Sequence, residues 1–149
     1  MVRLVAEFLS AAEVTLLGEL ARSVVYERGR QGTGYDKCSV VDRPEVAPIV
    51  QRALVELGVA ATHPHDAWLI RYGEGSHIPP HVDPVEEGAE HHRLNALVAA
   101  AAGGEVFVDG ALVALTVGAA NVFRPDAMRH EVSRVERGTR IVFSVGTLR

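Results

Sequence analysis

The segment from Arg71 to Pro84, RYGEGSHIPPHVDP, contains the residues of this sequence that are best suited to hold a metal ion. His81 and Asp83 are separated by one residue, so on an extended strand their side chains share a face, with Cα atoms about 6.5 Å apart. An imidazole nitrogen and a carboxylate oxygen suit divalent iron, and a second histidine completes a facial triad of two histidines and one carboxylate. We predict that His130 is this third ligand. The alternative is a solvated turn, because histidine and aspartate often occur in turns near prolines.

The five other histidines, which include His77, are less suited to this site. His63 and His65 have metal-like spacing but flank a proline in a predicted loop, so we expect them to be exposed to solvent. His91 and His92 follow the acidic run PVEEGAE, and we predict that they lie in a loop over the mouth of a pocket. Contact with a substrate is the open alternative for this pair.

The second half of the chain must supply the strands that position these residues. After about residue 66, short apolar runs alternate with turn residues, which predicts about eight β-strands. The runs are AWLIRY, HIPPHV, RLNALVAAA, EVFV, ALVALTV, ANVF, HEVSRV and TRIVFSVG. Asp109-Gly110 predicts a type I′ hairpin between two of them, because both residues tolerate the positive φ that this turn requires.

A second hairpin is predicted at residues 136–138, where a three-residue loop ends in glycine. This hairpin would pair Arg134 with Arg140 and His130 with Ser144. Alternation along the strands then places His130, Arg140 and Ser144 on one face.

Two amphipathic helices are predicted before the strands. Ser10 and Glu13 form a capping box, so the first helix should begin at Ala11. The second covers residues 46–57, where apolar residues recur at helical spacing before Gly58. A polar glycine-rich loop over 27–37 and a short strand over 37–41 separate the helices. This segregation favours helices packed on one face of an antiparallel sheet or barrel, of the sandwich, jelly-roll or cupin-like type.

Size and composition narrow the function classes. The chain has 149 residues, a formal charge of -4 and 48% hydrophobic residues, which predicts one globular domain over 1–149, with helical support over 1–60 and a β-core over 66–149. The sequence has no basic stripe and no apolar run long enough for a bilayer, so neither nucleic acid nor membrane is an expected partner. The absence of a secretory signal pattern and the single cysteine, Cys38, predict a cytoplasmic protein. The oligomeric state is left open.

Six segments resemble, in their order along the chain, the iron(II)- and 2-oxoglutarate-dependent oxygenases of the prolyl 4-hydroxylase-like superfamily. They are HVD (81–83), RLNAL (93–97), GGEVFV (103–108), GAANVF (118–123), HEV (130–132) and GTRIVF (138–143). The resemblance extends from about residue 66 to the C-terminus and loosely covers the helices. It implies a mainly β fold with flanking helices, built on a double-stranded β-helix core, and it supports the metal ligands named above.

The resemblance also implies how a cosubstrate is bound. A basic residue about ten positions after the distal histidine binds the C5 carboxylate of 2-oxoglutarate, and Arg140 stands there, with a guanidinium fork that matches a carboxylate. Hydroxyl hydrogen bonds from Tyr72 and Ser144 are further expectations, with strand packing and a backbone bond as the respective alternatives. The implied cofactors are Fe(II), 2-oxoglutarate and O2, with ascorbate as an accessory reductant.

The implied reaction is hydroxylation of an unactivated C–H bond, coupled to oxidative decarboxylation of 2-oxoglutarate to succinate and CO2. The expected substrate is a small metabolite or an amino acid, with a residue in a peptide as an alternative. Asp83 favours hydroxylation, because related halogenases have a small residue there, while desaturation and cyclisation stay open.

The chain departs from the family at Ala99 to Ala102, where bulkier side chains are usual, which implies an enlarged pocket or a lost cosubstrate contact. Two non-enzymatic alternatives remain: a β-helix module that binds a metal or ligand without turnover, and a purely structural barrel.

Overall fold

The computed structural model describes all residues from 1 to 149 and contains two α-helices, one short 3-10 helix and thirteen β-strands. The helices are α1 (Ala11–Ser23), η1 (Pro44–Val46) and α2 (Ala47–Glu56). The strands are β1 (Arg3–Val5), β2 (Glu27–Arg28), β3 (Asp36–Ser39), β4 (His65–Tyr72), β5 (Ile78–His81), β6 (His91–Ala99), β7 (Ala102–Gly103), β8 (Val106–Val108), β9 (Ala111–Val113), β10 (Ala120–Phe123), β11 (His130–Val132), β12 (Val135–Arg137) and β13 (Arg140–Leu148).

The helix signals in the sequence act as predicted. Ser10 Oγ accepts a hydrogen bond from the Glu13 amide at 3.1 Å, and the Glu13 carboxylate accepts one from the Ser10 amide at 3.0 Å. These two bonds satisfy amide groups that a helix N-terminus otherwise leaves free, and α1 begins at Ala11. Beyond α2, Gly58 has a φ of 74°, which suits a glycine stop. Neither α1 nor α2 has the length and apolar composition needed to cross a bilayer.

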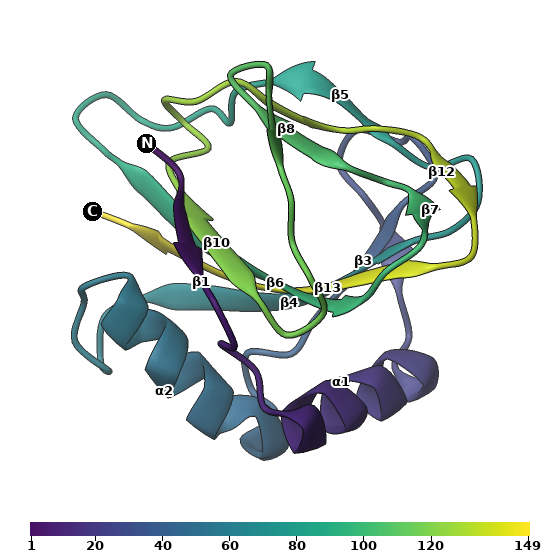
Figure 1. Cartoon of the computed structure of the whole chain (residues 1–149). Coiled ribbons are helices and arrows are strands. Elements are labelled where there is room, and N and C mark those ends of the chain that lie inside the picture. Colours follow the sequence, from purple (N-terminus) through teal and green to yellow (C-terminus); the bar gives the residue numbers. More distant parts are fainter.

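The strands form two main sheets that face each other. The larger sheet has seven strands in the order β1-β10-β6-β13-β4-β3-β2, and the smaller one has four in the order β5-β11-β8-β9. A third, two-stranded sheet joins β12 and β7. Figure 1 shows both helices beneath the larger sheet, with β5 and β8 above it. The interior between the two sheets is therefore enclosed below by the larger sheet, which the helices support from outside.

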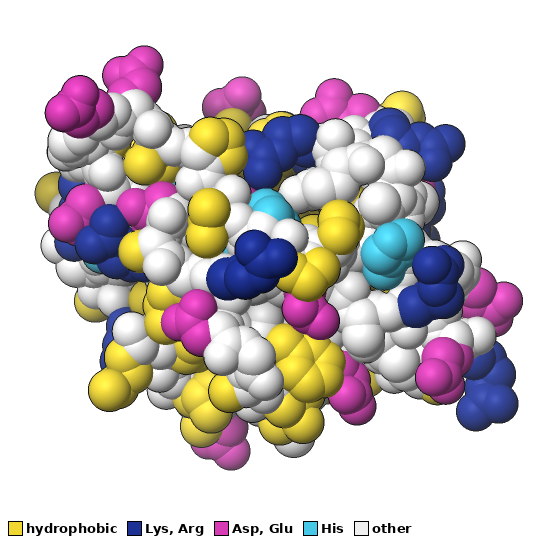
Figure 2. Space-filling model, turned by 90° about the horizontal axis from the view of Figure 1, so that it is seen from above, with side chains coloured by type: hydrophobic (Ala, Val, Ile, Leu, Met, Phe, Trp, Pro, Cys, Tyr) yellow, Lys and Arg dark blue, Asp and Glu magenta, His cyan; other side chains and the backbone are white.

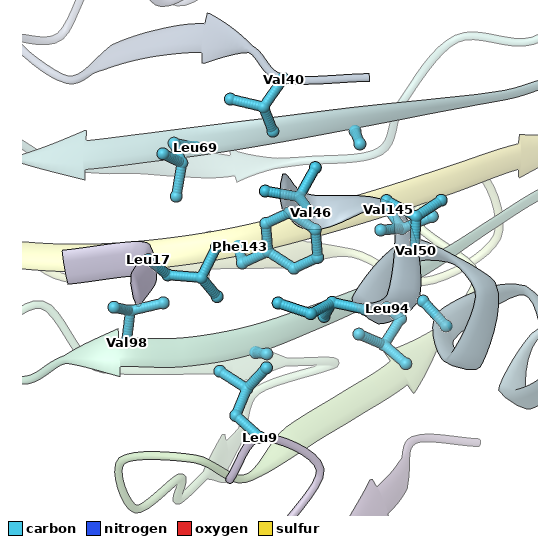
Figure 3. Packing of buried hydrophobic residues seen from close by; sticks show 14 of the residues in the cluster. Leu9, Leu17, Val40, Val46, Val50, Leu69, Leu94, Val98, Phe143 and Val145 are labelled. Carbon is cyan, nitrogen blue, oxygen red and sulfur yellow. The ribbon is translucent and has the colours of Figure 1, made fainter. Parts of the chain in front are cut away.

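The main hydrophobic core lies between the helices and the outer face of the larger sheet. Leu17 of α1 and Val50 of α2 pack with Phe143 at the centre of β13, and all three are almost completely buried (Figure 3). Ile141 and Val145 belong to the same core, since every second side chain of β13 faces the helices. The intervening side chains of β13 therefore point into the interior between the sheets.

The predicted mainly β architecture with two helices is confirmed, but its details differ. The chain has thirteen strands rather than about eight, because β1, β2 and β7 are only two or three residues long and the run HEVSRV divides into β11 and β12. The helices are also not a continuous N-terminal support. Strand β1 precedes α1, and β2 and β3 separate α1 from α2. Residues 1–60 thus contribute both edges of the larger sheet.

One predicted hairpin is confirmed and the other is wrong. Asp109 and Gly110 have φ values of 49° and 79°, and Val108 pairs with Ala111 across the turn, as a type I′ turn requires. The C-terminal hairpin does not form, because β11 pairs with β5 and β8, whereas β13 pairs with β4 and β6. His130 therefore does not pair with Ser144. The chain leaves the smaller sheet after β11, passes through β12 of the two-stranded sheet and enters the larger sheet at β13. A local turn signal does not distinguish such a crossing from a hairpin.

Candidate metal centre

His81, Asp83 and His130 converge at one end of the interior, with a ligand atom from each within 4.8 Å of the others. His130 begins β11 and lies directly opposite His81, the last residue of β5. Residues paired in this way have Cβ atoms about 5 Å apart, which is why residues 49 positions apart in the chain meet. Asp83 is held beside them because its amide donates a hydrogen bond to the Pro125 carbonyl at 2.8 Å.

Backbone contacts fix the orientation of both imidazoles. The Nδ1 of His81 lies 2.8 Å from the Pro79 carbonyl, and the Nδ1 of His130 lies 2.9 Å from the Met128 carbonyl. A carbonyl only accepts, so each Nδ1 carries the proton and each Nε2 keeps its lone pair. The two Nε2 atoms lie 3.1 Å and 3.7 Å from Asp83 Oδ1. This donor set fits a divalent first-row metal, with the ring orientation fixed by the carbonyls.

A further histidine orients the carboxylate. His91 Nδ1 lies 3.4 Å from Asp83 Oδ2, and Arg93 Nε donates to His91 Nε2 at 3.3 Å. Because a guanidinium only donates, His91 Nε2 must accept, which leaves the proton on Nδ1 for the Asp83 carboxylate. Asp83 therefore has Oδ2 occupied by His91 and Oδ1 directed towards the two ligand histidines.

The ionisation of these groups suits ligand chemistry. Burial alone would raise the pKa of Asp83, but the hydrogen bond from His91 and the positive charges that His130 and His91 carry in acid outweigh it and lower the pKa to about 2. Burial lowers the pKa of His130, which favours its neutral form. Asp83 is therefore ionised and His130 neutral near pH 7, as metal ligation requires.

The contact between His91 and Asp83 corrects one sequence expectation. His91 does not lie in a loop over the pocket mouth but opens β6, with a buried side chain that faces the interior. His92 points to the other side of the strand and contacts Glu90 at 2.9 Å. Period-two alternation from Arg93 and Asn95, which also line the interior, was the signal that could have identified His91.

Replacing His91 with alanine should weaken metal binding by about 10- to 100-fold, because residues that hydrogen-bond to a metal ligand and orient it have effects of this size. Nickel titration calorimetry measures the change. His92→Ala is the matched control and should keep wild-type affinity, since His92 faces away from the site. Equal affinities in the two variants would exclude a role for His91 in orienting Asp83.

Arg140 lies at the other end of the interior as a buried cation without an acidic partner. Arg140 is 6% exposed, and no carboxylate lies within 4.0 Å of its guanidinium group. The guanidinium carbon lies 5.1 Å from the centre of the Tyr72 ring. Burial lowers the pKa of Arg140 and raises that of Tyr72, so Tyr72 stays a neutral phenol. A buried cation of this kind is a site for an anion, with the Tyr72 hydroxyl beside it.

The sequence did not identify a second arginine, Arg93, as part of the interior. Arg93 donates to Asp66 at 3.0 Å and to Ser144 at 2.8 Å, so its charge is balanced within the protein. Ser144 in turn donates to Asn95 at 2.6 Å and is completely buried. The hydroxyl of Ser144 contacts side chains rather than the backbone, so the alternative of a backbone bond is wrong, and its hydrogen bond to a cosubstrate stays a prediction. Of the two interior arginines, only Arg140 lacks an acidic partner.

A cavity of about 340 Å³ connects the three candidate metal ligands with Arg140, and its walls come from both sheets. Val132 and Val142 provide apolar surface between the two ends. Where the molecule is viewed from above, histidine side chains reach the surface beside Lys or Arg side chains (Figure 2).

Within the cavity, Asn121 is 1% exposed and neither its amide nitrogen nor its oxygen has a hydrogen-bond partner. Unpaired buried groups of this kind are rare, and a ligand or a water molecule in the cavity would supply the missing partners.

Replacing Asn121 with valine should stabilise the ligand-free protein by about 1–3 kcal/mol, because the substitution removes two unpaired buried polar atoms and valine suits a strand. The same substitution at Asn95, the neighbour of Asn121 in register, should destabilise the protein, because Ser144 would lose its acceptor. Urea unfolding of both variants measures the effects. A less stable Asn121→Val protein would show that the amide has a partner within the fold.

Comparison with known proteins supports the fold. No protein-family model matches the chain, and a search of curated proteins finds no significant match. Among solved structures, the viral collagen prolyl hydroxylase of Paramecium Bursaria Chlorella virus-1 is similar, with a TM-score of 0.75, 15% identity, and coverage of 98% of this chain and 95% of that chain. A Pseudomonas putida prolyl-4-hydroxylase has a TM-score of 0.73 at 17% identity, covering 97% of this chain and 90% of that chain.

A third similar structure, HygX from Streptomyces hygroscopicus, contains nickel and 2-oxoglutarate. It has a TM-score of 0.73 at 9% identity and covers 97% of this chain and 81% of that chain. At these identities the similarity establishes the fold. The chain therefore has the fold of the prolyl 4-hydroxylase-like 2-oxoglutarate and iron(II) oxygenases.

Proposed function

We propose that this protein is an iron(II)- and 2-oxoglutarate-dependent dioxygenase of the prolyl 4-hydroxylase-like superfamily, which hydroxylates a C–H bond of a small molecule. The observation that carries the proposal is one cavity with three convergent ligands at one end and an unpaired buried guanidinium at the other. A metal-chelating dianion such as 2-oxoglutarate complements both ends. The similar structures that contain 2-oxoglutarate support this choice of cosubstrate.

Each end of the cavity has a defined task in this proposal. His81, Asp83 and His130 hold the metal, and iron(II) bound there would supply oxidation of the substrate by O2, coupled to decarboxylation of 2-oxoglutarate. Arg140 binds the C5 carboxylate, and the Tyr72 hydroxyl donates to the same group. Charge supports the arrangement: a metal of +2, Asp83 at -1, the dianion at -2 and Arg140 at +1 sum to zero, which a buried site tolerates.

The cavity volume limits the substrate. A volume of about 340 Å³ is at the lower end of the usual range for small-molecule sites, and 2-oxoglutarate must share it. A small metabolite, a free amino acid or one side chain of a peptide is therefore the substrate that we propose. A carboxylate at position 83 favours hydroxylation over halogenation, since it fills the metal position that a halide would need.

Turnover tests the proposal. Purified protein supplied with iron(II), ascorbate and 2-oxoglutarate in air should produce succinate, and the substrate should gain one oxygen atom by mass spectrometry. His81→Ala should abolish both signals, whereas His63→Ala should not, because His63 bonds to the Leu148 carbonyl outside the cavity. Succinate formation that persists in His81→Ala would contradict the assigned metal site.

A purely structural barrel is the second candidate. The observation that favours it is Gln31, whose amide Nε2 lies 3.0 Å from His81 Nε2, the atom proposed to bind the metal. A protein donor at this position competes with the metal. Absence of iron(II) and 2-oxoglutarate binding under anaerobic conditions would support this candidate.

A further inference from the structure

The loop between β2 and β3, residues 29–35, brings two side chains to the metal ligands. One guanidinium nitrogen of Arg30 lies 3.3 Å from Asp83 Oδ1, and Gln31 Nε2 lies 3.0 Å from His81 Nε2. Asp83 Oδ1 is also the oxygen that faces both ligand histidines. Arg30 and Gln31 thus contact the same atoms that the proposed metal would use.

Metal binding would leave Arg30 without its present partner. A divalent cation that takes Asp83 Oδ1 repels the guanidinium and removes the carboxylate that now balances it. The Arg30 side chain is 54% exposed, so it has room to turn away from the carboxylate while staying at the cavity.

Tyr35 keeps this loop at the cavity mouth. Its ring covers Gly29, where an added Cβ would lie 2.1 Å from a Tyr35 ring carbon, and its hydroxyl bonds to the Gln31 side chain. The same ring stacks on Tyr72 with centroids 5.6 Å apart, and Tyr72 contacts Arg140. The loop carrying Arg30 is therefore packed against the proposed cosubstrate site, and Arg30 stays within reach of the cavity.

The other basic residues of the cavity are each accounted for. Arg93 is paired with Asp66, and Lys37 lies 4.0 Å from Glu27 and 4.4 Å from the Trp68 ring. Arg140 is the proposed site for the C5 carboxylate. The cavity lining also contains one acidic residue without an ion pair, Glu131, which belongs to β11 of the smaller sheet. Arg30 is the one cation at the cavity whose partner the metal would displace.

We propose that Arg30 binds a carboxylate of the substrate, and hence that the substrate is a small carboxylic acid. This inference rests on the proposed function, because it takes the metal and 2-oxoglutarate to occupy their assigned positions. A guanidinium matches a carboxylate with two parallel hydrogen bonds, so Arg30 selects acids over their neutral amides. Arg30 is a substrate-binding residue in this proposal and holds no part of the metal centre.

The test uses the full chain loaded with nickel and 2-oxoglutarate, so that binding is measured without turnover. Trp68 is the only tryptophan and lines the cavity, so its fluorescence reports ligand binding. The probes are small carboxylic acids, including free amino acids, each compared with its primary amide. At least one acid should bind about tenfold or more tightly than its amide, and Arg30→Gln should lose this preference. Arg28→Gln, an exposed position on β2 outside the cavity, should keep it.

A second readout does not depend on finding the substrate. Arg30→Gln should bind nickel at least as tightly as the wild type. The substitution removes a positive charge that lies 3.3 Å from Asp83 Oδ1 and would repel the metal ion. Loss of nickel or 2-oxoglutarate binding in this variant would overturn the inference by making Arg30 part of the metal centre. Wild-type protein that binds nickel and 2-oxoglutarate but prefers no acid over its amide would overturn the inference alone. Wild-type protein that binds neither would overturn the proposed function.

Discussion

Replacing His130 with alanine is expected to lower the affinity for nickel or iron(II) by at least about 100-fold and to abolish succinate formation. The loss of a direct ligand should weaken metal binding at least as much as the loss of a residue that orients a ligand. His130 is the ligand that comes from a distant strand, so its loss leaves only His81 and Asp83, which are two residues apart. Metal titration calorimetry measures the affinity. Circular dichroism of the variant should match the wild type, because the lost side chain lines a cavity rather than the main core.

The control for this variant is His65→Ala. The His65 side chain bonds to the His63 carbonyl and lies outside the ligand cluster, so its loss should leave metal affinity unchanged. If the His130→Ala protein bound metal as tightly as the wild type, the ion would have to sit elsewhere and the triad would be wrong.

Replacing Arg140 with methionine is expected to lower the affinity for 2-oxoglutarate by at least about 100-fold while leaving metal affinity within a few-fold of wild type. The guanidinium is the one buried cation of the interior without an acidic partner, so no other group would replace it. The ligand-free variant should also be more stable, by about 1 kcal/mol or more, because methionine removes an unpaired charge from a buried position. Calorimetry with nickel-loaded protein and urea unfolding measure the two effects.

Two comparisons make this prediction specific. Arg129→Met changes an exposed arginine near the metal end and should leave 2-oxoglutarate binding unchanged. Arg93→Met removes the other interior guanidinium, which is already paired with Asp66, and should have a smaller effect on the cosubstrate than Arg140→Met. If Arg93→Met lost more 2-oxoglutarate affinity than Arg140→Met, the C5 carboxylate would bind Arg93 and the assignment to Arg140 would be wrong.

The side-chain directions of the site could be predicted from the sequence because strands have a period of two. His81 and Asp83 share a face at a separation of two residues, and the same rule places Arg140 and Ser144 in the interior with Ile141 and Phe143 in the core. The predicted pairing of this strand was wrong, yet the predicted face was right. Alternation depends only on the strand itself, whichever strand lies beside it.

Contacts between sheets could not be predicted in this way. His91 opens β6 immediately after a polar loop, where strand boundaries are hard to place, and its partner Asp83 lies in another segment. The contacts of Arg30 and Gln31 with the metal ligands are set by how the β2–β3 loop folds over the cavity. Glycine allows many backbone conformations, so the sequence of a glycine-rich loop does not predict the course of its backbone. The very short strands β1, β2 and β7 carry no periodic pattern to detect.

The most direct measurement is a crystal structure of the protein grown with nickel and 2-oxoglutarate. We predict one ion bound by Nε2 of His81, Nε2 of His130 and a carboxylate oxygen of Asp83, with the far carboxylate of 2-oxoglutarate on Arg140. An ion at any other set of side chains, or a cosubstrate whose far carboxylate lies away from Arg140, would contradict the account.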